Sequence, residues 1–170
     1  MLLKNYYLIL GSWFSYRSVT LKDTSGTDRG VVIGLYGWCK GGSPNYYNLK
    51  MRANSPEGNT SYGIVVGTSD MPVSPDDCAI NVIPHGTSSG QLYYHPTEVK
   101  EVVVSNNVIE QEITRSISNE TDSDIEVKEF GLILRYDAKG YNFLIAREVS
   151  PVTVPAHGVL EVTFKFRTVV

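Results

Sequence analysis

Polar and apolar residues alternate regularly near the end of the chain, between residues 159 and 168. One set of alternate positions reads Leu160, Val162, Phe164, Phe166 and Thr168, and the interleaved set reads Val159, Glu161, Thr163, Lys165 and Arg167. Side chains of a β-strand point to opposite faces with a period of two. The pattern therefore predicts a strand with one buried and one solvated face, held in place by pairing with another strand.

Further strands are predicted along the whole chain, because Tyr, Val, Ile and Thr are frequent and favour a pleated, half-buried surface. The 15 glycines and 8 prolines punctuate these segments. The expected strands are 6–14, 18–22, 31–36, 47–51, 62–66, 91–94, 98–105, 108–118, 125–136, 141–147, 152–154 and 159–168. Many short elements joined by turns are typical of a sandwich or a barrel.

The segment 108–118 fits two patterns. Ile109, Ile113 and Ile117 are spaced four apart, which also suits one face of a helix. Thr and Ser are unfavourable inside helices, and the turn-forming "NETDSD" follows, so a strand is favoured. In the segment 125–136, the apolar positions change parity near Glu129, which predicts a β-bulge there.

The long segments of the second half, joined by tight turns, predict an antiparallel meander or Greek-key sheet. We therefore predict an all-β fold, an antiparallel β-sandwich of the jelly-roll or Ig-like Greek-key kind with little or no helix. The length of 170 residues is sufficient for one domain with its own core. That domain is expected to span residues 1–170, with residues 1–60 as its less regular part.

Composition narrows the range of partners. Hydrophobic residues make up 42% of the chain and charged residues 19%, and the formal net charge is −3. A chain without a basic run is not expected to bind nucleic acid or an anionic membrane. The N-terminal segment lacks a signal-peptide cleavage site, and no stretch approaches the roughly 20 apolar residues that span a bilayer. Cys39 and Cys78 are interpreted as two thiols, with a disulfide as the alternative.

Residues suited to catalysis are not grouped in the sequence. The three histidines lie beside glycine or proline in predicted turns, without the spacing of metal ligands, and are His85, His95 and His157. The acidic segment 67–77 is interrupted by prolines, which favours turns over a calcium loop. Phosphate-binding loops and nucleophile elbows do not occur. We therefore expect a protein that is not an enzyme and that needs neither a cofactor nor a metal.

Aromatic residues are the remaining candidates for a functional surface. Large rings with a polar tip dominate protein–protein interfaces, and they also form platforms on which sugars stack. Because carboxylates and amides do not cluster near them, a protein interface is favoured. The candidate interface residues are Trp13, Trp38, Tyr46, Tyr47, Tyr93 and Tyr94.

Two C-terminal segments, "DIEVKEFGLILR" and "YNFLIAREVSPVTVPAHGVLEVTF", carry a more distinctive pattern. They resemble the ending of a group of small structural proteins from tailed bacteriophages and related viruses. The matching residues are Val127, Glu129, Gly131, Leu132, Phe143, Leu144, Ala146, Arg147, Glu148, Val149, 151–155, Gly158, Leu160, Val162 and Thr163. Upstream, "GIVVGTSDMPVSPDDCAI" and "HGTSSGQLYY" are similar to two further segments of that group, with departures at Asp70 and Cys78.

The resemblance implies a non-enzymatic virion component, such as a head decoration, neck, collar or tail protein, made in the host cytoplasm. It implies other virion proteins and copies of the same chain as partners, in a homo-oligomer or another symmetric assembly. The group carries no catalytic motif. The alternative function is a carbohydrate- or receptor-binding β-sandwich module, in which the same aromatic residues would contact the ligand.

Overall fold

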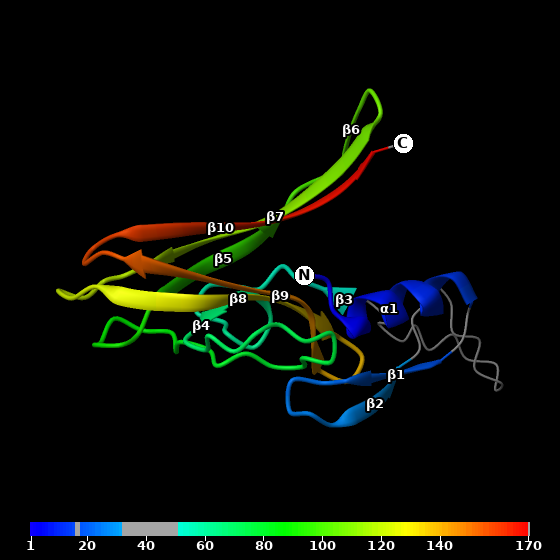
Figure 1. Cartoon of the computed structure of the whole chain (residues 1–170), viewed down its shortest axis with the longest axis horizontal. Helices are drawn as coiled ribbons and strands as arrows, with labels where there is room; N and C mark the ends of the chain where they lie inside the picture. Colours follow the sequence, from blue (N-terminus) through cyan, green and yellow to red (C-terminus); the bar gives the residue numbers. More distant parts are fainter. Residues whose placement is uncertain (16–17, 32–50, 170) are drawn as a thin grey trace.

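The computed structural model of the chain describes residues 1–15, 18–31 and 51–169, with the backbone alone for residues 13–15. Two antiparallel sheets pack against each other, which confirms the predicted all-β sandwich (Figure 1). The elements are α1 (Lys4–Ser15), β1 (Val19–Lys22), β2 (Asp28–Val31), β3 (Met51–Arg52), β4 (Gly63–Gly67), β5 (Tyr93–Val99), β6 (Val103–Ser105), β7 (Val108–Ser118), β8 (Ile125–Tyr136), β9 (Tyr141–Val154) and β10 (Val159–Val169).

The two sheets are each organised around one long strand. In the first, here called the β7 sheet, the order is β10-β7-β5, and β6 also pairs with β7. In the second, the β8 sheet, the order is β3-β8-β4, and β9 also pairs with β8. Along the chain, the β8–β9 hairpin lies between β7 and β10, and these two strands pair with each other in the other sheet. The four long strands therefore do not form the single meander sheet that was one of the two expectations.

The predicted bounds of β7 and β8 are confirmed, including the choice of strand over helix for β7. The bulge expected near Glu129 is present as a register shift between Val127 and Glu129. Ser150 and Pro151 lie opposite this shift, where the ladder is interrupted, and β9 continues through them instead of ending at Arg147. Proline is tolerated at such a position because it has no N–H to donate.

The predicted strand 6–14 is wrong, because the chain forms the helix α1 there. The face of α1 that meets the sandwich contains the buried polar residues Asn5 and Ser12, which are seven positions apart and lie two helical turns from each other. The Asn5 side chain donates hydrogen bonds to the carbonyls of Lys22 (2.8 Å) and Leu144 (3.2 Å). A helix whose buried face is partly polar gives no clear apolar period, and the run of Leu and Ile imitates a strand.

Residues 1–3 lie along the outer edge of β9. Leu3 N–H donates to the Ile145 carbonyl (2.8 Å), and Arg147 N–H donates to the Met1 carbonyl (3.1 Å). This short segment covers the middle of the β9 edge and leads directly into α1. In the described part of the chain, no helix is long and apolar enough to cross a membrane.

Buried apolar side chains form two clusters. The larger cluster fills the space between the sheets and includes Leu132 and Leu144 from the β8 sheet and Ile117 from the β7 sheet. The smaller cluster joins the β1–β2 hairpin to the far end of β8 and β9 and contains Leu21, Val31, Tyr136 and Phe143. The N-terminal elements therefore pack on one end of the sandwich (Figure 1).

The turn of the β1–β2 hairpin is organised by the buried carboxylate of Asp23. It accepts hydrogen bonds from Ser25 Oγ (2.6 Å), the N–H groups of Ser25 and Thr27 (both 3.0 Å) and Arg29 Nε (2.7 Å). Burial alone would raise the pKa of Asp23, but these bonds outweigh it and lower the pKa from 3.8 to about 2.

This shift predicts an acid-dependent hairpin. The bonds to Asp23 stabilise the fold fully above pH 3.8, and that stabilisation is lost as the pH falls through about 2. Asp23→Asn should lower the free energy of unfolding near neutral pH and should flatten its dependence on pH in this range, as measured by urea denaturation. Asp28→Asn, an exposed change in the same hairpin, is the control. Parallel pH curves for the wild type and Asp23→Asn would contradict the assignment.

Candidate functional site

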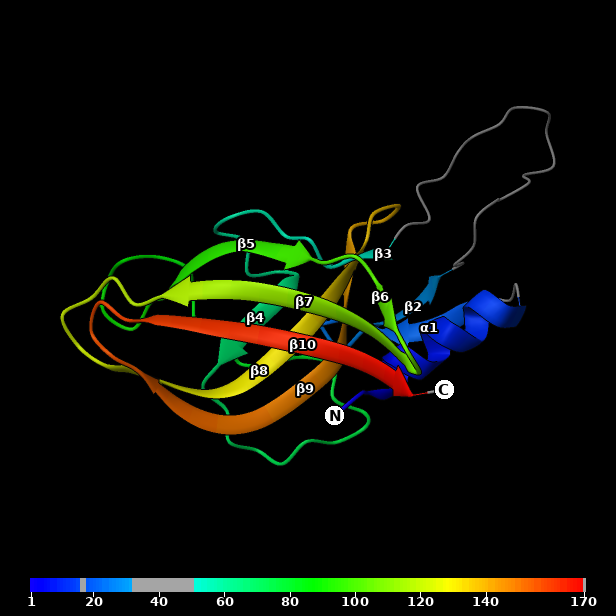
Figure 2. The same cartoon turned by 90° about the horizontal axis from the view of Figure 1, so that it is seen from above.

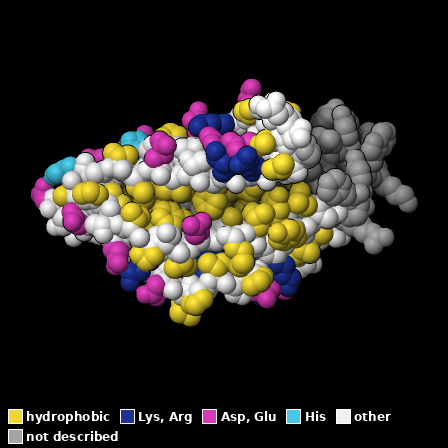
Figure 3. All heavy atoms as spheres, turned by 45° about the horizontal axis from the view of Figure 1, so that its top comes forward, with side chains coloured by type: hydrophobic (Ala, Val, Ile, Leu, Met, Phe, Trp, Pro, Cys, Tyr) yellow, Lys and Arg dark blue, Asp and Glu magenta, His cyan; other side chains and the backbone are white. Residues whose placement is uncertain are grey.

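An apolar groove runs along the side of the sandwich where β9 and β10 lie at the edges of different sheets. Its volume is about 840 Å³. Phe164 and Phe166 of β10 form one wall, and Phe130 and Val152 of the β8 sheet form the other. The space-filling view shows a band of hydrophobic side chains along this side of the molecule, bordered by a group of charged side chains (Figure 3). We call this feature the edge groove.

One end of the edge groove is closed by the N-terminal segment. Met1, Leu2, Tyr6, Tyr7 and Leu10 contribute to its lining. The Tyr6 ring stacks on Phe166 with 6.0 Å between the ring centroids. The helix that sequence reasoning missed is therefore part of the candidate site, because its residues line the groove and its Tyr6 ring contacts Phe166 of β10.

The edge of β10 that faces the groove pairs with no strand among the described residues. Asn119 N–H donates to the Gly158 carbonyl (2.9 Å), so the even-numbered residues of β10 direct their backbone groups toward β7. Because these directions alternate along an antiparallel strand, the odd-numbered residues direct theirs toward the open edge. Among the described residues, a row of unpaired backbone donors and acceptors thus lies beside the groove.

The outer face of the β7 sheet is polar, as the alternation in β10 predicts. Lys165 lies 2.8 Å from Glu112 and 3.1 Å from Glu110, and Lys100 lies 2.9 Å from Glu112. The hydrogen bonds from Lys165 and Lys100 lower the pKa of Glu112 to about 2. These exposed pairs place opposite charges across neighbouring strands, which supports the register of the sheet.

The far end of the β7 sheet rises away from the body as an arm formed by β6 and the adjoining ends of β7 and β10 (Figure 1). Its apolar side chains are largely uncovered, with Val103 60% and Val104 69% exposed. Exposed apolar patches of this kind mark surfaces that contact other molecules.

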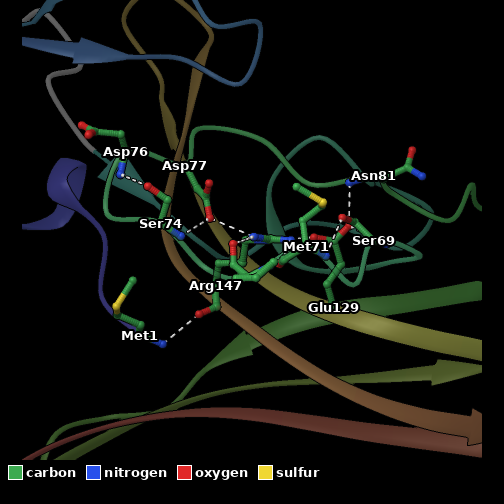
Figure 4. A network of polar contacts seen from close by, with 10 residues as sticks. Met1, Ser69, Met71, Ser74, Asp76, Asp77, Asn81, Glu129 and Arg147 are labelled. Carbon is green, nitrogen blue, oxygen red and sulfur yellow. Dashed lines mark hydrogen bonds and ion pairs between the residues drawn. The ribbon is translucent and has the colours of Figure 1, made fainter.

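Two residues of the bacteriophage-like pattern form a buried ion pair. Glu129 is fully buried and Arg147 is nearly so, and Arg147 Nε donates to Glu129 Oε2 at 2.8 Å (Figure 4). Glu129 Oε1 also accepts from the N–H groups of Ser69 (3.2 Å) and Asn81 (2.8 Å). The carboxylate thus fastens the loop that follows β4 to the β8 sheet.

Arg147 fastens the same loop at further points. Its guanidinium donates to Asp77 Oδ2 (2.8 Å) and to the Met71 carbonyl (3.1 Å) (Figure 4). Burial alone would lower the pKa of Arg147, but the bonds to Glu129 and Asp77 outweigh it and raise the pKa. With every charge neutralised and hydrogen-bonded, this cluster is suited to holding a loop in place rather than to proton transfer. In the sequence, this cluster is indicated by a Glu and an Arg at inward-facing positions of predicted strands.

Tyr94 is a core residue and not part of a surface, in contrast to its assignment as an interface candidate. Its hydroxyl donates to the carbonyls of Ile83 (2.8 Å) and Val66 (3.2 Å). Its ring lies 4.8 Å from the guanidinium carbon of Arg115. Burial raises the pKa of Tyr94. Tyr93 and Tyr94 point to opposite faces of β5, as adjacent strand residues must, and the inward one is buried.

Arg115 is a buried cation that bridges the two sheets. It donates to the carbonyls of Ile64 (2.7 Å), His95 (2.6 Å) and Pro56 (3.3 Å). Burial lowers its pKa to about 10. Sequence reasoning missed this residue, although a lone Arg between Ile113 and Ile117 on one face of a strand is a signal of such a role.

Tyr93 is half-buried and lies between two of the histidines that the sequence analysis placed in turns. Its ring centroid is 4.8 Å from that of His85 and 5.2 Å from that of His95, and its hydroxyl donates to Glu57. His95 Nε2 lies 2.6 Å from Ser118 Oγ. Sequence spacing could not show that the two histidines meet, because a loop and a strand bring them together.

The other candidates are only partly placed. Trp13 lies in α1, in the part described by its backbone alone, and Trp38, Tyr46 and Tyr47 lie outside the described residues. Cys39 also lies outside them, and Cys78 is a half-buried free thiol.

The acidic segment forms turns, as expected. Ser74 N–H donates to Asp77 Oδ2 (2.9 Å), and Asp76 and Asp70 lie 3.0 Å and 3.4 Å from lysines. His157 is exposed and lies 3.0 Å from Asp122. Within residues 1–15, 18–31 and 51–169, no group of three or more His, Cys, Asp or Glu side chains could hold a metal ion.

Comparison with models of protein families, with curated proteins and with solved structures finds no match to this chain.

The buried ion pair predicts a large effect of one conservative change. Glu129→Gln should lower the free energy of unfolding by about 3 kcal/mol, because Arg147 loses its most buried counter-charge. Glu126→Gln on the same strand is the control, since Glu126 is exposed and its ion pair with Lys128 is long at 3.7 Å. Urea denaturation measures both. Equal, small losses in the two variants would show that the Glu129 charge is not needed to hold the loop.

Proposed function

We propose that this chain is a non-enzymatic structural protein of a tailed bacteriophage or related virus and that it acts by assembling with other virion proteins and with copies of itself. The observation that carries the proposal is the edge groove, an apolar channel beside an unpaired strand edge. Open edges and uncovered apolar surface favour association with another polypeptide.

The distribution of charge supports assembly over catalysis. Two buried ionic groups, Glu129 and Arg147, are saturated by hydrogen bonds to each other and to one loop. Neither lines the edge groove, whose lining combines apolar side chains from both sheets and α1 with polar and charged residues of β9 and β10. An apolar channel bordered by backbone donors is suited to binding a peptide chain.

The virion assignment rests on the bacteriophage-like pattern, and the positions of its residues support it. Its charged residues, Glu129 and Arg147, fix the loop after β4, and its C-terminal part builds β9, the crossing to β10, and the groove-lining residues Leu160 and Val162. The pattern therefore covers part of the groove lining, including Val152, Leu160 and Val162. In a symmetric particle, many copies of a modest interface give a stable assembly through avidity.

The proposal predicts that the protein is a stoichiometric part of particles. Mass spectrometry of gradient-purified particles from cells that carry the gene should detect this chain at a copy number matching a symmetric assembly. Particles of an unrelated virus, mixed with the same lysate and purified in parallel, control for carry-over. Finding the chain only in the soluble fraction, and never in the particles, would contradict the virion assignment.

A further inference from the structure

We propose that the edge groove receives a single extended strand from another polypeptide, which pairs antiparallel with β10 and completes the β7 sheet. This inference rests on the proposed function and names the form of the partner: a β-strand with apolar residues at alternate positions, rather than a helix or a second folded surface. Three features favour such a strand: the backbone of β10, the shape of the groove and the charges beside it.

The backbone of β10 is able to form hydrogen bonds with a further strand. Register with β7 is continuous from Val159 to Val169, without a bulge that would twist the free edge away. The Asn119–Gly158 bond places the backbone groups of Glu161, Thr163, Lys165 and Arg167 on the open side. The bond from Lys100 N–H to the Glu112 carbonyl (2.9 Å), on the opposite edge of β7, agrees with this alternation. Donors and acceptors repeated every second residue match a strand, whereas a helix satisfies its own backbone groups.

The groove provides the space beneath such a strand. In Figure 2, β9 lies beyond the free edge of β10, and Figure 1 shows that it does so in the other layer. A strand placed beside β10 would therefore lie above β9. Its inward side chains would contact Phe130 and Val152, which already line the groove with Phe164 and Phe166. The added strand would bury apolar surface on one face and leave the other in solvent, as in the rest of the β7 sheet.

The same overhang argues against the edge of a second sandwich as the occupant. Two copies that paired β10 with β10 would be related by a two-fold axis perpendicular to the β7 sheet. Each copy would then extend its own β9 beneath the β10 of the other, into the layer already filled by β8 and β9 (Figure 2). A separate strand brings no second layer with it and avoids this overlap.

Charges on the outward face of β10 specify the partner further. Among the described residues, neither Glu161 nor Arg167 has an ion-pair partner, whereas Lys165 is already paired with Glu110 and Glu112. Opposite charges directly across an antiparallel pair are stabilising, and like charges are destabilising. The strand that fits best therefore carries a basic residue opposite Glu161 and, six positions away, an acidic residue opposite Arg167.

The test uses a synthetic peptide built on these rules and the full-length chain. The peptide matches the 11 residues of β10, with Val or Ile facing the groove, Thr facing outward, Lys opposite Glu161 and Glu opposite Arg167. A fluorescein label allows binding to be followed by anisotropy. We expect saturable binding, and at least tenfold weaker binding for a peptide of the same composition with its Lys and Glu exchanged.

Two substitutions at one residue separate backbone pairing from simple apolar contact. Thr163→Pro removes an N–H that points to the open edge, at an edge position where proline is tolerated. Thr163→Ala keeps that N–H and, like the proline, loses the contact between the Thr163 and Thr114 hydroxyls (3.1 Å). We expect Thr163→Ala to bind the peptide like the wild type and Thr163→Pro to bind it at least tenfold more weakly. Circular dichroism and urea denaturation confirm that both variants are folded.

Equal affinity of the two Thr163 variants, or no saturable binding to the wild type, would overturn the inference. Arg167→Glu supplies a test of register, since each peptide would then make one attractive and one repulsive pair, and the preference between the two peptides should be lost. The outcomes separate this inference from the proposed function. If the chain is incorporated into particles but binds neither peptide, the strand partner is contradicted and the virion assignment stands. If the chain binds the peptide but is absent from particles, the strand site stands and the virion assignment is contradicted.

Discussion

The crossing of the chain from β9 to β10 is the constraint on which the rest of the molecule depends. Consecutive long strands usually pair with each other, but here a turn at residues 155–158 carries the chain from one sheet to the other. Gly158 N–H donates to the Pro155 carbonyl (2.9 Å), and His157 adopts a positive φ of 57°. A Cβ on Gly158 would lie 2.9 Å from that carbonyl oxygen, so the turn requires glycine there. Because β9 and β10 do not pair, the edge of β10 stays open among the described residues, residues 1–3 cover the middle of the β9 edge, and the groove lies between the two strands.

Buried charges stabilise this arrangement in two different ways. Glu129 and Arg147 form an ion pair that holds a long loop, and the desolvation of both groups is offset by hydrogen bonds on every side. Arg115 has no buried carboxylate beside it among the described residues and relies on carbonyl groups and the Tyr94 ring. Both arginines connect segments that are distant in sequence. The Arg115 bridge fixes the relative position of the two layers, which apolar contacts alone would leave freer to slide, and the Glu129–Arg147 pair fixes a loop on one of them.

Much of the sandwich could be predicted from local sequence. The bounds of β7 and β8, the bulge near Glu129 and the two faces of β10 follow from a period of two, which a half-buried strand imposes on its residues. Periodicity identifies the buried face of a strand but not its neighbour. The separation of β9 and β10, and therefore the groove, could not be predicted. The helix α1 was missed because Asn5 and Ser12 occupy its buried face, and Tyr94 was misassigned because the two members of an adjacent aromatic pair cannot be told apart without knowing which face is inside.

The overhang of β9 beyond β10 also bears on how the free protein behaves in solution. An uncovered strand edge is ordinarily a hazard, because identical edges can join without limit into fibres. Here β9 projects beyond β10 in the other sheet, which leaves room for a single strand but would clash with the sheet edge of a second copy. Pairing of β10 with β10 of a second copy is thereby disfavoured, and the strand site stays open until the correct chain arrives.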